Sequence, residues 1–297
     1  MNVHPRATEY AQSHLDRMIP DESELTAGVN IEPGKQYGFF TDTTLCIGCK
    51  ACEVACKEWN ALPADHLELS GWSYDNTRGL SANTWRHVSF VEKVRVDGDD
   101  ANAMPPFQSH WKMMSDVCKH CHNAPCEESC PTGALFRTEF DTVVVQQDIC
   151  NGCGICVPSC PFGVIDINLF DGKAHKCTLC YDRLKGGLEP ACAKACPTDS
   201  IQFGELGELH RRATERVASL HNNGAREAYI YGMPGTPGAT GGLGHLHAFF
   251  LLTDRPEVYN LAPHPSRGAN RVLPAMITGV MTAIALTGAV FGFLATV

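Results

Sequence analysis

Sixteen cysteines constrain this 297-residue sequence more than any other feature. They fall into four groups of four, and no cysteine is left over. In the first and third groups the spacing is C-x2-C-x2-C-x3-C, while the second gap widens to four residues in the second group and to eleven in the fourth. A proline follows the last cysteine of the second, third and fourth groups, as Pro131, Pro161 and Pro197. The first group has Lys57 at that place.

This spacing predicts [4Fe–4S] clusters, because three cysteines within seven residues can wrap one cube from a tight loop. In the bacterial ferredoxin pattern the fourth cysteine ligates the other cluster of a pair, and the proline after it turns the chain out of its helix. Zinc is the first alternative, but zinc ribbons use two separated C-x2-C pairs and have no use for a third nearby cysteine. A disulfide scaffold is the second alternative. It usually belongs to a short secreted chain, and residues 1–30 contain no apolar run typical of an export signal.

Distance along the chain predicts which groups share clusters. Only nineteen residues separate groups two and three, about the spacing inside a compact two-cluster ferredoxin, so groups one and four then pair across that inserted unit. Sequential pairing is the alternative, and it would place the long segment 60–111 inside one unit. With fourth ligands exchanged, the predicted sets are set A, Cys46, Cys49, Cys52 and Cys196; set B, Cys56, Cys177, Cys180 and Cys192; set C, Cys118, Cys121, Cys126 and Cys160; and set D, Cys130, Cys150, Cys153 and Cys156.

The expected fold is therefore α+β, with two bacterial-ferredoxin-like units, one nested in the other, and a C-terminal transmembrane helix. The predicted divisions are an N-terminal extension (1–36), an outer unit (37–116 and 161–205), an inserted unit (117–160), a helix and linker that pack on partner subunits (206–271), and the membrane helix (272–297).

Secondary structure can be predicted at four places. Residues 87–96 and 247–252 are apolar and strand-like. The run 97–100, Asp-Gly-Asp-Asp, predicts an exposed turn. Apolar residues recur at helical spacing from Leu206 to Leu220, and Asn222-Asn223-Gly224 should end that helix.

The segment 272–297 contains no charged side chain and is long enough to cross a hydrocarbon core as a helix. A buried core helix is the alternative, but the terminal position after a polar linker favours the crossing. Arg267 and Arg271 would place the iron–sulfur domain in the cytoplasm by the positive-inside rule. Large translocated domains override that rule, so the membrane face is left open.

Charge narrows the possible partners and environments. A formal net charge of −9 argues against nucleic acid, whose recognition needs a basic stripe. Lysines beside the cluster cysteines can offset the negative charge of the clusters and tune their potentials, although any single one is more often an exposed solubilising charge. These lysines are Lys50, Lys57, Lys119, Lys176 and Lys194.

The thirteen histidines show no ligand spacing, but His120 and His122 flank Cys121. No catalytic motif is present, so no catalytic residue is assigned.

The sequence around the cysteines resembles the iron–sulfur (beta) subunit of respiratory, membrane-associated formate dehydrogenases, within the wider group that serves molybdopterin oxidoreductases. The stretches that carry the resemblance are 43–60, 117–140, 143–166, 176–204 and 251–265. It implies a non-catalytic electron-transfer subunit with four [4Fe–4S] clusters, whose ligand pairing in the family agrees with sets A to D.

The resemblance also implies partners. A catalytic (alpha) subunit with a molybdenum or tungsten bis-pterin cofactor would oxidise formate, and a cytochrome b (gamma) membrane subunit would pass the electrons to quinone. The location would be the bacterial cell membrane, with the lipid bilayer contacted through 272–297. The alternatives are the same relay role for a hydrogenase or for a nitrate or sulfur-compound reductase, and a zinc-stapled interaction module.

Overall fold

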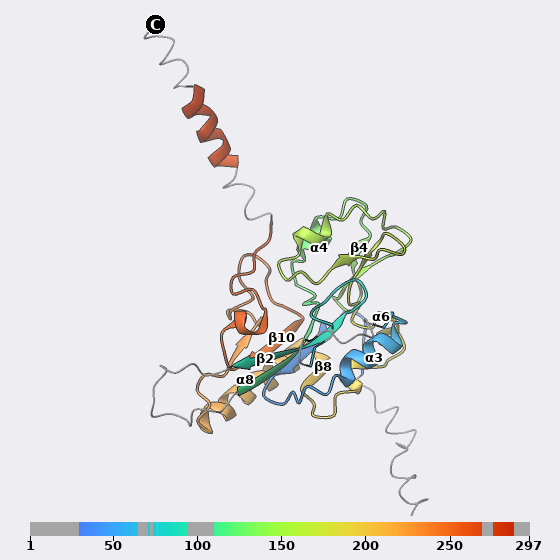
Figure 1. Ribbon diagram of the computed structural model, residues 1–297, viewed down its shortest axis with the longest axis vertical. Coiled ribbons are helices and arrows are strands. Elements are labelled where there is room, and N and C mark those ends of the chain that lie inside the picture. Colours follow the sequence, from blue (N-terminus) through green and yellow to red (C-terminus); the bar gives the residue numbers. More distant parts are fainter. Residues whose placement is uncertain are drawn as a thin grey trace, which may run out of the picture.

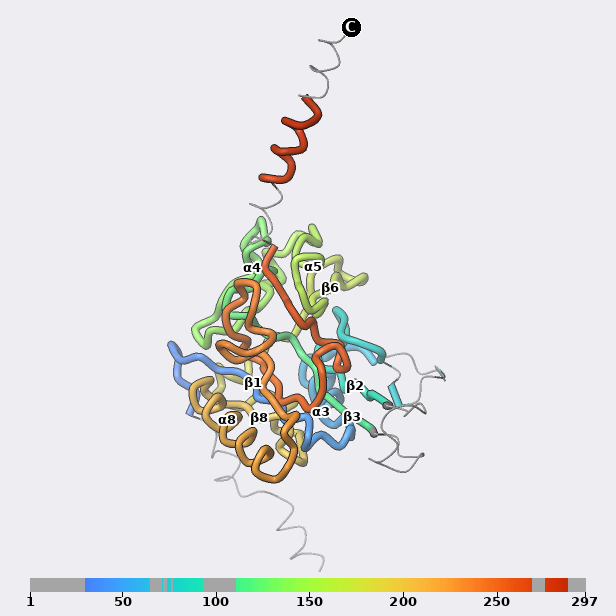
Figure 2. Tube along the Cα trace, turned by 90° about the vertical axis from the view of Figure 1, so that its left-hand side faces the viewer, coloured from blue at the N-terminus to red at the C-terminus, as the bar shows by residue number. Residues whose placement is uncertain are grey.

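The computed structural model describes residues 30–64, 71, 74–75, 77–93, 110–268 and 276–287. Two short helices, α4 (Pro125–Glu128) and α5 (Cys156–Ser159), lie toward one end of the molecule (Figures 1 and 2). The helices α3 (Ala51–Trp59) and α8 (Leu206–Asn222) lie toward the other end, around the main sheet. The cysteine-rich segments therefore occupy two neighbouring regions of one body.

A four-stranded mixed sheet supports the molecule. Its strand order is β8 (Ile201–Glu205), β1 (Tyr37–Asp42), β10 (Ala248–Leu252) and β9 (Tyr229–Tyr231). The strand β1 runs parallel to β10 and antiparallel to β8, while β9 pairs antiparallel with β10. Every residue of β1 and β10 is buried, as expected for central strands covered on both faces. The predicted strand at 247–252 is thus confirmed.

The helix α8 covers one face of this sheet. Leu206, Leu209 and Ala213 are buried there and belong to one apolar cluster with Phe40 and Phe249 of the central strands. The helix spans the predicted apolar repeat and ends at Asn222, so this prediction is confirmed. No cysteine contributes to the cluster under α8.

The opposite face of the sheet meets the cysteine-bearing segments. Phe39, Phe203 and Ala248 share an apolar cluster with cysteines of groups one, two and four. There α3 packs against α7 (Ala191–Lys194), and at the other end of the molecule α4 packs against α5. Each helix pair therefore joins two cysteine groups.

The described part also contains three two-stranded ladders, the helix α6 (Tyr181–Lys185) and a 3₁₀ turn at Pro256–Tyr259. The ladders are β2 (Arg86–Lys93) with β3 (His110–Val117), β4 (Leu135–Arg137) with β5 (Val143–Val145), and β6 (Asp166–Ile167) with β7 (Ala174–His175). The strand predicted at 87–96 is confirmed as far as residue 93. Residues 94–96 and the turn predicted at 97–100 lie outside the described residues, as do residues 1–29 of the predicted N-terminal extension.

The predicted transmembrane helix at 272–297 is wrong. Among the described residues no helix is long and apolar enough to cross a membrane. The helix within that segment is described over 276–287, which is 12 residues, whereas a crossing needs about 20. Residues 272–275 and 288–297 lie outside the described part. The prediction failed because lack of charge indicates hydrophobicity but does not fix how far a helix extends.

Candidate metal centres

All four cysteine loops share one backbone device. The residue immediately before the second cysteine of each group has a positive φ, at Gly48, His120, Gly152 and Leu179, with values of 66°, 41°, 73° and 56°. This conformation curls the chain, so that successive cysteines can face one centre. Glycine is required at one of these places, because a Cβ on Gly152 would lie 2.1 Å from the carbonyl oxygen of Gly172.

The four cysteines of set C line one cavity. This cavity lies between the loop that begins at Cys118, the helix α4 that carries Cys126, and Cys160, which follows α5. Burial and, after it, neighbouring thiols raise the pKa of Cys121 far above its usual range.

The four cysteines of set A line a second cavity. Cys46 and Cys49 come from the first loop, Cys52 from α3, and Cys196 from the segment after α7. Burial raises the pKa of Cys46, and the thiols of Cys196 and Cys49 act in the same direction. Cys49 is exposed, so this cavity reaches the protein surface.

In sets B and D the four thiols lie close enough to affect one another's ionisation. Burial first, and then the nearby thiols of Cys177, Cys192 and Cys180, raise the pKa of Cys56. Those are the other three members of set B.

In set D, burial raises the pKa of Cys156 to about 11, and the thiols of Cys150, Cys153 and Cys130 contribute to the rise. Of these four cysteines only Cys153 is exposed. The fourth member of each set therefore comes from the partner group of its pair.

The donor chemistry fits iron–sulfur clusters. All sixteen cysteines lie in the described residues and are free thiols, so the disulfide reading has no support there. The thiol is the donor that all four sets share, and thiolates are the ligands of [4Fe–4S] cubes. Because burial and mutual repulsion oppose ionisation of these thiols, a cationic metal core is needed to hold four thiolates together.

Two of the five lysines named from the sequence are buried beside the cysteines. Lys119 forms an ion pair with Asp116, donates to the carbonyl of Val117 at 2.9 Å, and lines the set C cavity. Lys176 lines the same cavity and donates to the carbonyls of Val143 and Cys177.

The other three lysines lie nearer the surface. Lys50 pairs with Glu53 and Asp75 at 3.6 Å, and Lys57 donates to the carbonyl of Asn83 at 3.0 Å. The side chain of Lys194 is 54% exposed, the ordinary solvated arrangement.

Sequence reasoning missed Arg86, which is 1% exposed and lies between sets A and B. Its Nη2 donates to Cys192 Sγ at 3.2 Å and its Nη1 to Ser115 Oγ at 3.3 Å. Ser115 Oγ in turn lies 3.2 Å from Cys52 Sγ. The signal in the sequence was an arginine that shares one face of a strand with Val88 and Phe90, where the period-two pattern calls for an apolar residue.

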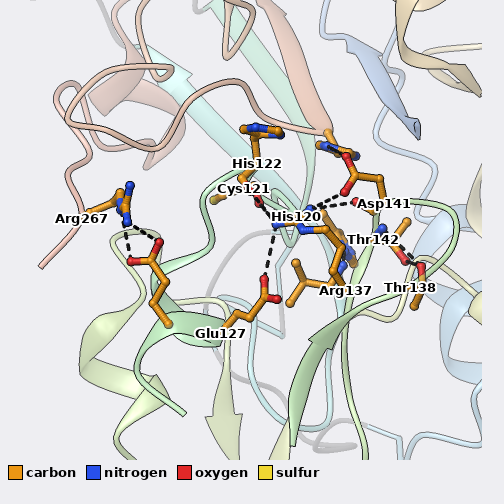
Figure 3. A network of polar contacts seen from close by, with 12 residues as sticks. His120, Cys121, His122, Glu127, Arg137, Thr138, Asp141, Thr142 and Arg267 are labelled. Carbon is orange, nitrogen blue, oxygen red and sulfur yellow. Dashed lines mark hydrogen bonds and ion pairs between the residues drawn. The ribbon is translucent and has the colours of Figure 1, made fainter. Parts of the chain in front are cut away.

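Arg137 fixes the loop that carries Cys121 (Figure 3). Its Nη2 donates to the carbonyl of Cys121 at 2.9 Å and to that of His122 at 2.6 Å, while Nη1 pairs with Asp141 at 3.0 Å. His120 also belongs to this wall: it is buried, and the backbone N–H of Val143 donates to its Nδ1 at 3.2 Å. Burial lowers the pKa of His120, so it enters the cavity wall as a neutral ring.

Three histidines form a second cluster of possible metal ligands. Ring nitrogens of His122, His245 and His247 lie within 4.8 Å of one another. The rings are stacked, however, with interplanar angles of 25° for His122–His245 and 12° for His245–His247. A tetrahedral zinc site needs nitrogens that converge to about 2.0–2.1 Å from one ion, whereas parallel rings hold them side by side. We therefore interpret this cluster as an aromatic stack.

Comparisons with known proteins agree with this chemistry. Two family models, each described as a 4Fe-4S dicluster domain, match residues 45–134 and 109–206. The chain is 38% identical to the formate dehydrogenase iron-sulfur subunit of Haemophilus influenzae, over 75% of this chain and 67% of the relative. It is 37% identical to the iron-sulfur subunit of the nitrate-inducible formate dehydrogenase of Escherichia coli, over 75% of this chain and 70% of the relative. It is also 38% identical to a thiosulfate reductase electron transfer subunit of Salmonella typhi, over 58% and 78%.

Proposed function

The chain belongs to the family of formate dehydrogenase iron–sulfur subunits, and we propose on that premise that it is the electron-transfer subunit of a formate dehydrogenase complex. Bound [4Fe–4S] clusters would supply one-electron carriers. The protein supplies their thiolate ligands, their spacing and the charges around them. The observation that carries the proposal is the arrangement of the sixteen thiols in four buried or half-buried sets of four.

We assign the ligands of the four clusters to sets A, B, C and D as predicted. The cavities lined by sets A and C support two of the assignments, and the mutual effects of the thiols on their pKa values support the other two. The same pairing supports a division into an outer unit (37–116 and 161–205) and an inserted unit (117–160). We extend the proposal to a following segment, 206–271, that packs on partner subunits.

Neighbouring sets suggest a linear order A–B–C–D. Arg86 and Ser115 link Cys52 of set A to Cys192 of set B. The thiol of Cys118, in set C, is the nearby charge that most raises the pKa of Cys177 in set B, after burial.

Sets C and D are joined by their helices, because α4 packs against α5 and each helix carries one cysteine of one set and leads into a cysteine of the other. The only exposed cysteines, Cys49 and Cys153, belong to the two outermost sets. We therefore propose that partner proteins exchange electrons with this chain at sets A and D.

For the partners we propose a catalytic subunit with a molybdenum or tungsten bis-pterin that oxidises formate, and a membrane cytochrome b subunit that leads to quinone. A relay for a sulfur-compound reductase is the second candidate, supported by the similarity to the thiosulfate reductase subunit. The formate dehydrogenase relatives match 75% of this chain and the thiosulfate reductase subunit 58%, which favours formate.

The test is to purify the native complex anaerobically, identify its subunits, and measure iron, acid-labile sulfide and electron paramagnetic resonance (EPR) spectra. We expect about 16 iron atoms per chain and cluster reduction on addition of formate. Reduction by another donor but not by formate would transfer the same role to another oxidoreductase. Stoichiometric zinc without sulfide would refute the iron–sulfur assignment itself.

A further inference from the structure

Arg86 occupies a place where a charged side chain needs a specific reason. It is the largest side chain among those that are almost fully buried, and its guanidinium lies 4.7 Å from the ring centre of Phe39. Its hydrogen bonds go to Cys192 Sγ and to the carbonyl and hydroxyl oxygens of Ser115, and its Nε has no partner. Within the part of the chain that the structure describes, no carboxylate forms an ion pair with it.

The β2–β3 ladder holds the guanidinium in this position. Its register pairs Arg86 with Val117 and Val88 with Ser115, so Ser115 is the diagonal neighbour of Arg86 on the same face. Ser115 fixes one end of the guanidinium while its hydroxyl lies against Cys52 Sγ at 3.2 Å. The cation is therefore placed between a ligand of set A and a ligand of set B.

A second buried cation in the molecule shows the usual solution. Lys119 is as deeply buried as Arg86, but it pairs with the carboxylate of Asp116. An unpaired buried charge is strongly unfavourable, and arginine does not escape by losing its proton. The anion that compensates Arg86 must therefore lie at the cysteines.

We propose that Arg86 is a positioning residue for the outer unit, whose fixed positive charge and N–H···S hydrogen bond raise the reduction potentials of the clusters held by sets A and B. This inference rests on the proposed function, because it needs clusters at these two sets. A [4Fe–4S] core with four thiolates has a net charge of about −2 when oxidised and about −3 when reduced. On reduction one electron enters from the donor, no bond breaks and no proton is needed, so a nearby cation stabilises the product more than the reactant.

The experiment is an EPR-monitored potentiometric titration of the purified complex, in wild type and three variants. R86Q removes the charge and keeps a hydrogen-bond donor, while R86K keeps the charge. R211Q is the matched control, because it removes an arginine charge from an exposed position on α8, where Arg211 pairs with Glu208 and Glu215.

In R86Q we expect the ratio of oxidised to reduced cluster, at a given potential, to rise at least tenfold for two of the four clusters. A tenfold rise in that ratio corresponds to a midpoint potential that is lower by 59 mV. The other two clusters should change less than threefold, as should all four clusters in R86K and R211Q. An R86Q protein with full iron content and unchanged midpoints overturns the proposal, and so does an R86K protein that shifts as far as R86Q.

Two further readings keep the test decisive. If wild type holds no iron–sulfur clusters, the proposed function fails before Arg86 is tested. If R86Q assembles no clusters at sets A and B, the test uses wild type instead, with the midpoint potentials of those two clusters measured at pH 6.5 and 8.5. A guanidinium stays charged over that range, so we expect the midpoint potentials of the clusters at sets A and B to be independent of pH. A tenfold change in the ratio per pH unit would mean that a proton compensates the added electron, and would overturn the proposal.

Discussion

The exchange of fourth ligands can be tested by counting iron in double cysteine variants. Cys160 belongs to the third cysteine group in the sequence, but it lines the cavity of set C with Cys118, Cys121 and Cys126. The helix α5, which leads into Cys160, carries Cys156, whose thiol neighbours are Cys150, Cys153 and Cys130. The structure therefore predicts that Cys160 and Cys126 act on one cluster, and that Cys160 and Cys156 act on two different clusters.

The expected numbers follow from four cubes on sixteen thiols, or about 16 iron atoms per chain. If C160A abolishes its cluster, about 12 irons remain. C126A/C160A should then also retain about 12, because both changes damage the same site, while C156A/C160A should retain about 8.

The assay is total iron and acid-labile sulfide per chain in anaerobically purified complex, with EPR spectra to identify the cluster type. C126A, C156A and C160A alone are the controls that fix the loss from each site. The reverse pattern, with C156A/C160A equal to C160A and C126A/C160A additive, would refute the exchange of fourth ligands.

Three further predictions concern stability. Leu209 is a fully buried residue of α8 that faces the sheet, so L209A should destabilise the protein by about 2–5 kcal/mol and lower its Tm. V217A, at a half-buried position on the same helix, should destabilise the protein clearly less. Equal losses of stability in the two variants would contradict the packing described here. Burial lowers the pKa of His247 to about 4, below the value of about 6.5 expected when unfolded, so its contribution to stability is present above pH 6.5 and is lost as the pH falls toward 4. Thermal midpoints of H247Q should therefore depend less on pH between 7 and 5 than those of wild type, and parallel curves would rule this out. Removal of iron with a chelator should expose α4, α5 and α7 to amide hydrogen exchange but leave α8 protected, because the apolar cluster under α8 contains no cysteine. Simultaneous loss of protection in all four helices would show that α8 and the cysteine-bearing helices do not unfold separately.

Local patterns in the sequence predicted several elements well. The apolar repeat from Leu206 to Leu220 and the stop at Asn222 gave α8, because a helix is specified by residues close together in the chain. The cysteine spacing predicted the chemistry of the site for the same reason. The ligand sets stay a prediction that the iron counts above can test.

Contacts between residues far apart in the chain could not be predicted from local sequence patterns. The bond between Arg86 and Cys192 joins residues 106 positions apart, and nothing in either neighbourhood indicates the other. The buried state of Lys119 and Lys176 likewise depends on the packing of the rings and carbonyls around them, since lysines beside cysteines are more often solvated. The transmembrane prediction failed for a different reason, because it rested on composition alone, and composition does not determine the length of a helix.

If ligands are exchanged between nested units as we propose, the order of the cysteines in the chain also sets the order in which ligand sets are completed during synthesis. The eight cysteines between Cys118 and Cys160 emerge from the ribosome close together, so sets C and D are complete within one short stretch of translation. Cys46, by contrast, waits for Cys196, which lies 150 residues later. At about 5–20 residues per second, that delay is roughly 8–30 s. On the proposed ligand sets, thiols of the outer unit would stay incomplete for this whole interval, and we expect that half of the molecule to be the more vulnerable to oxygen while it is being made.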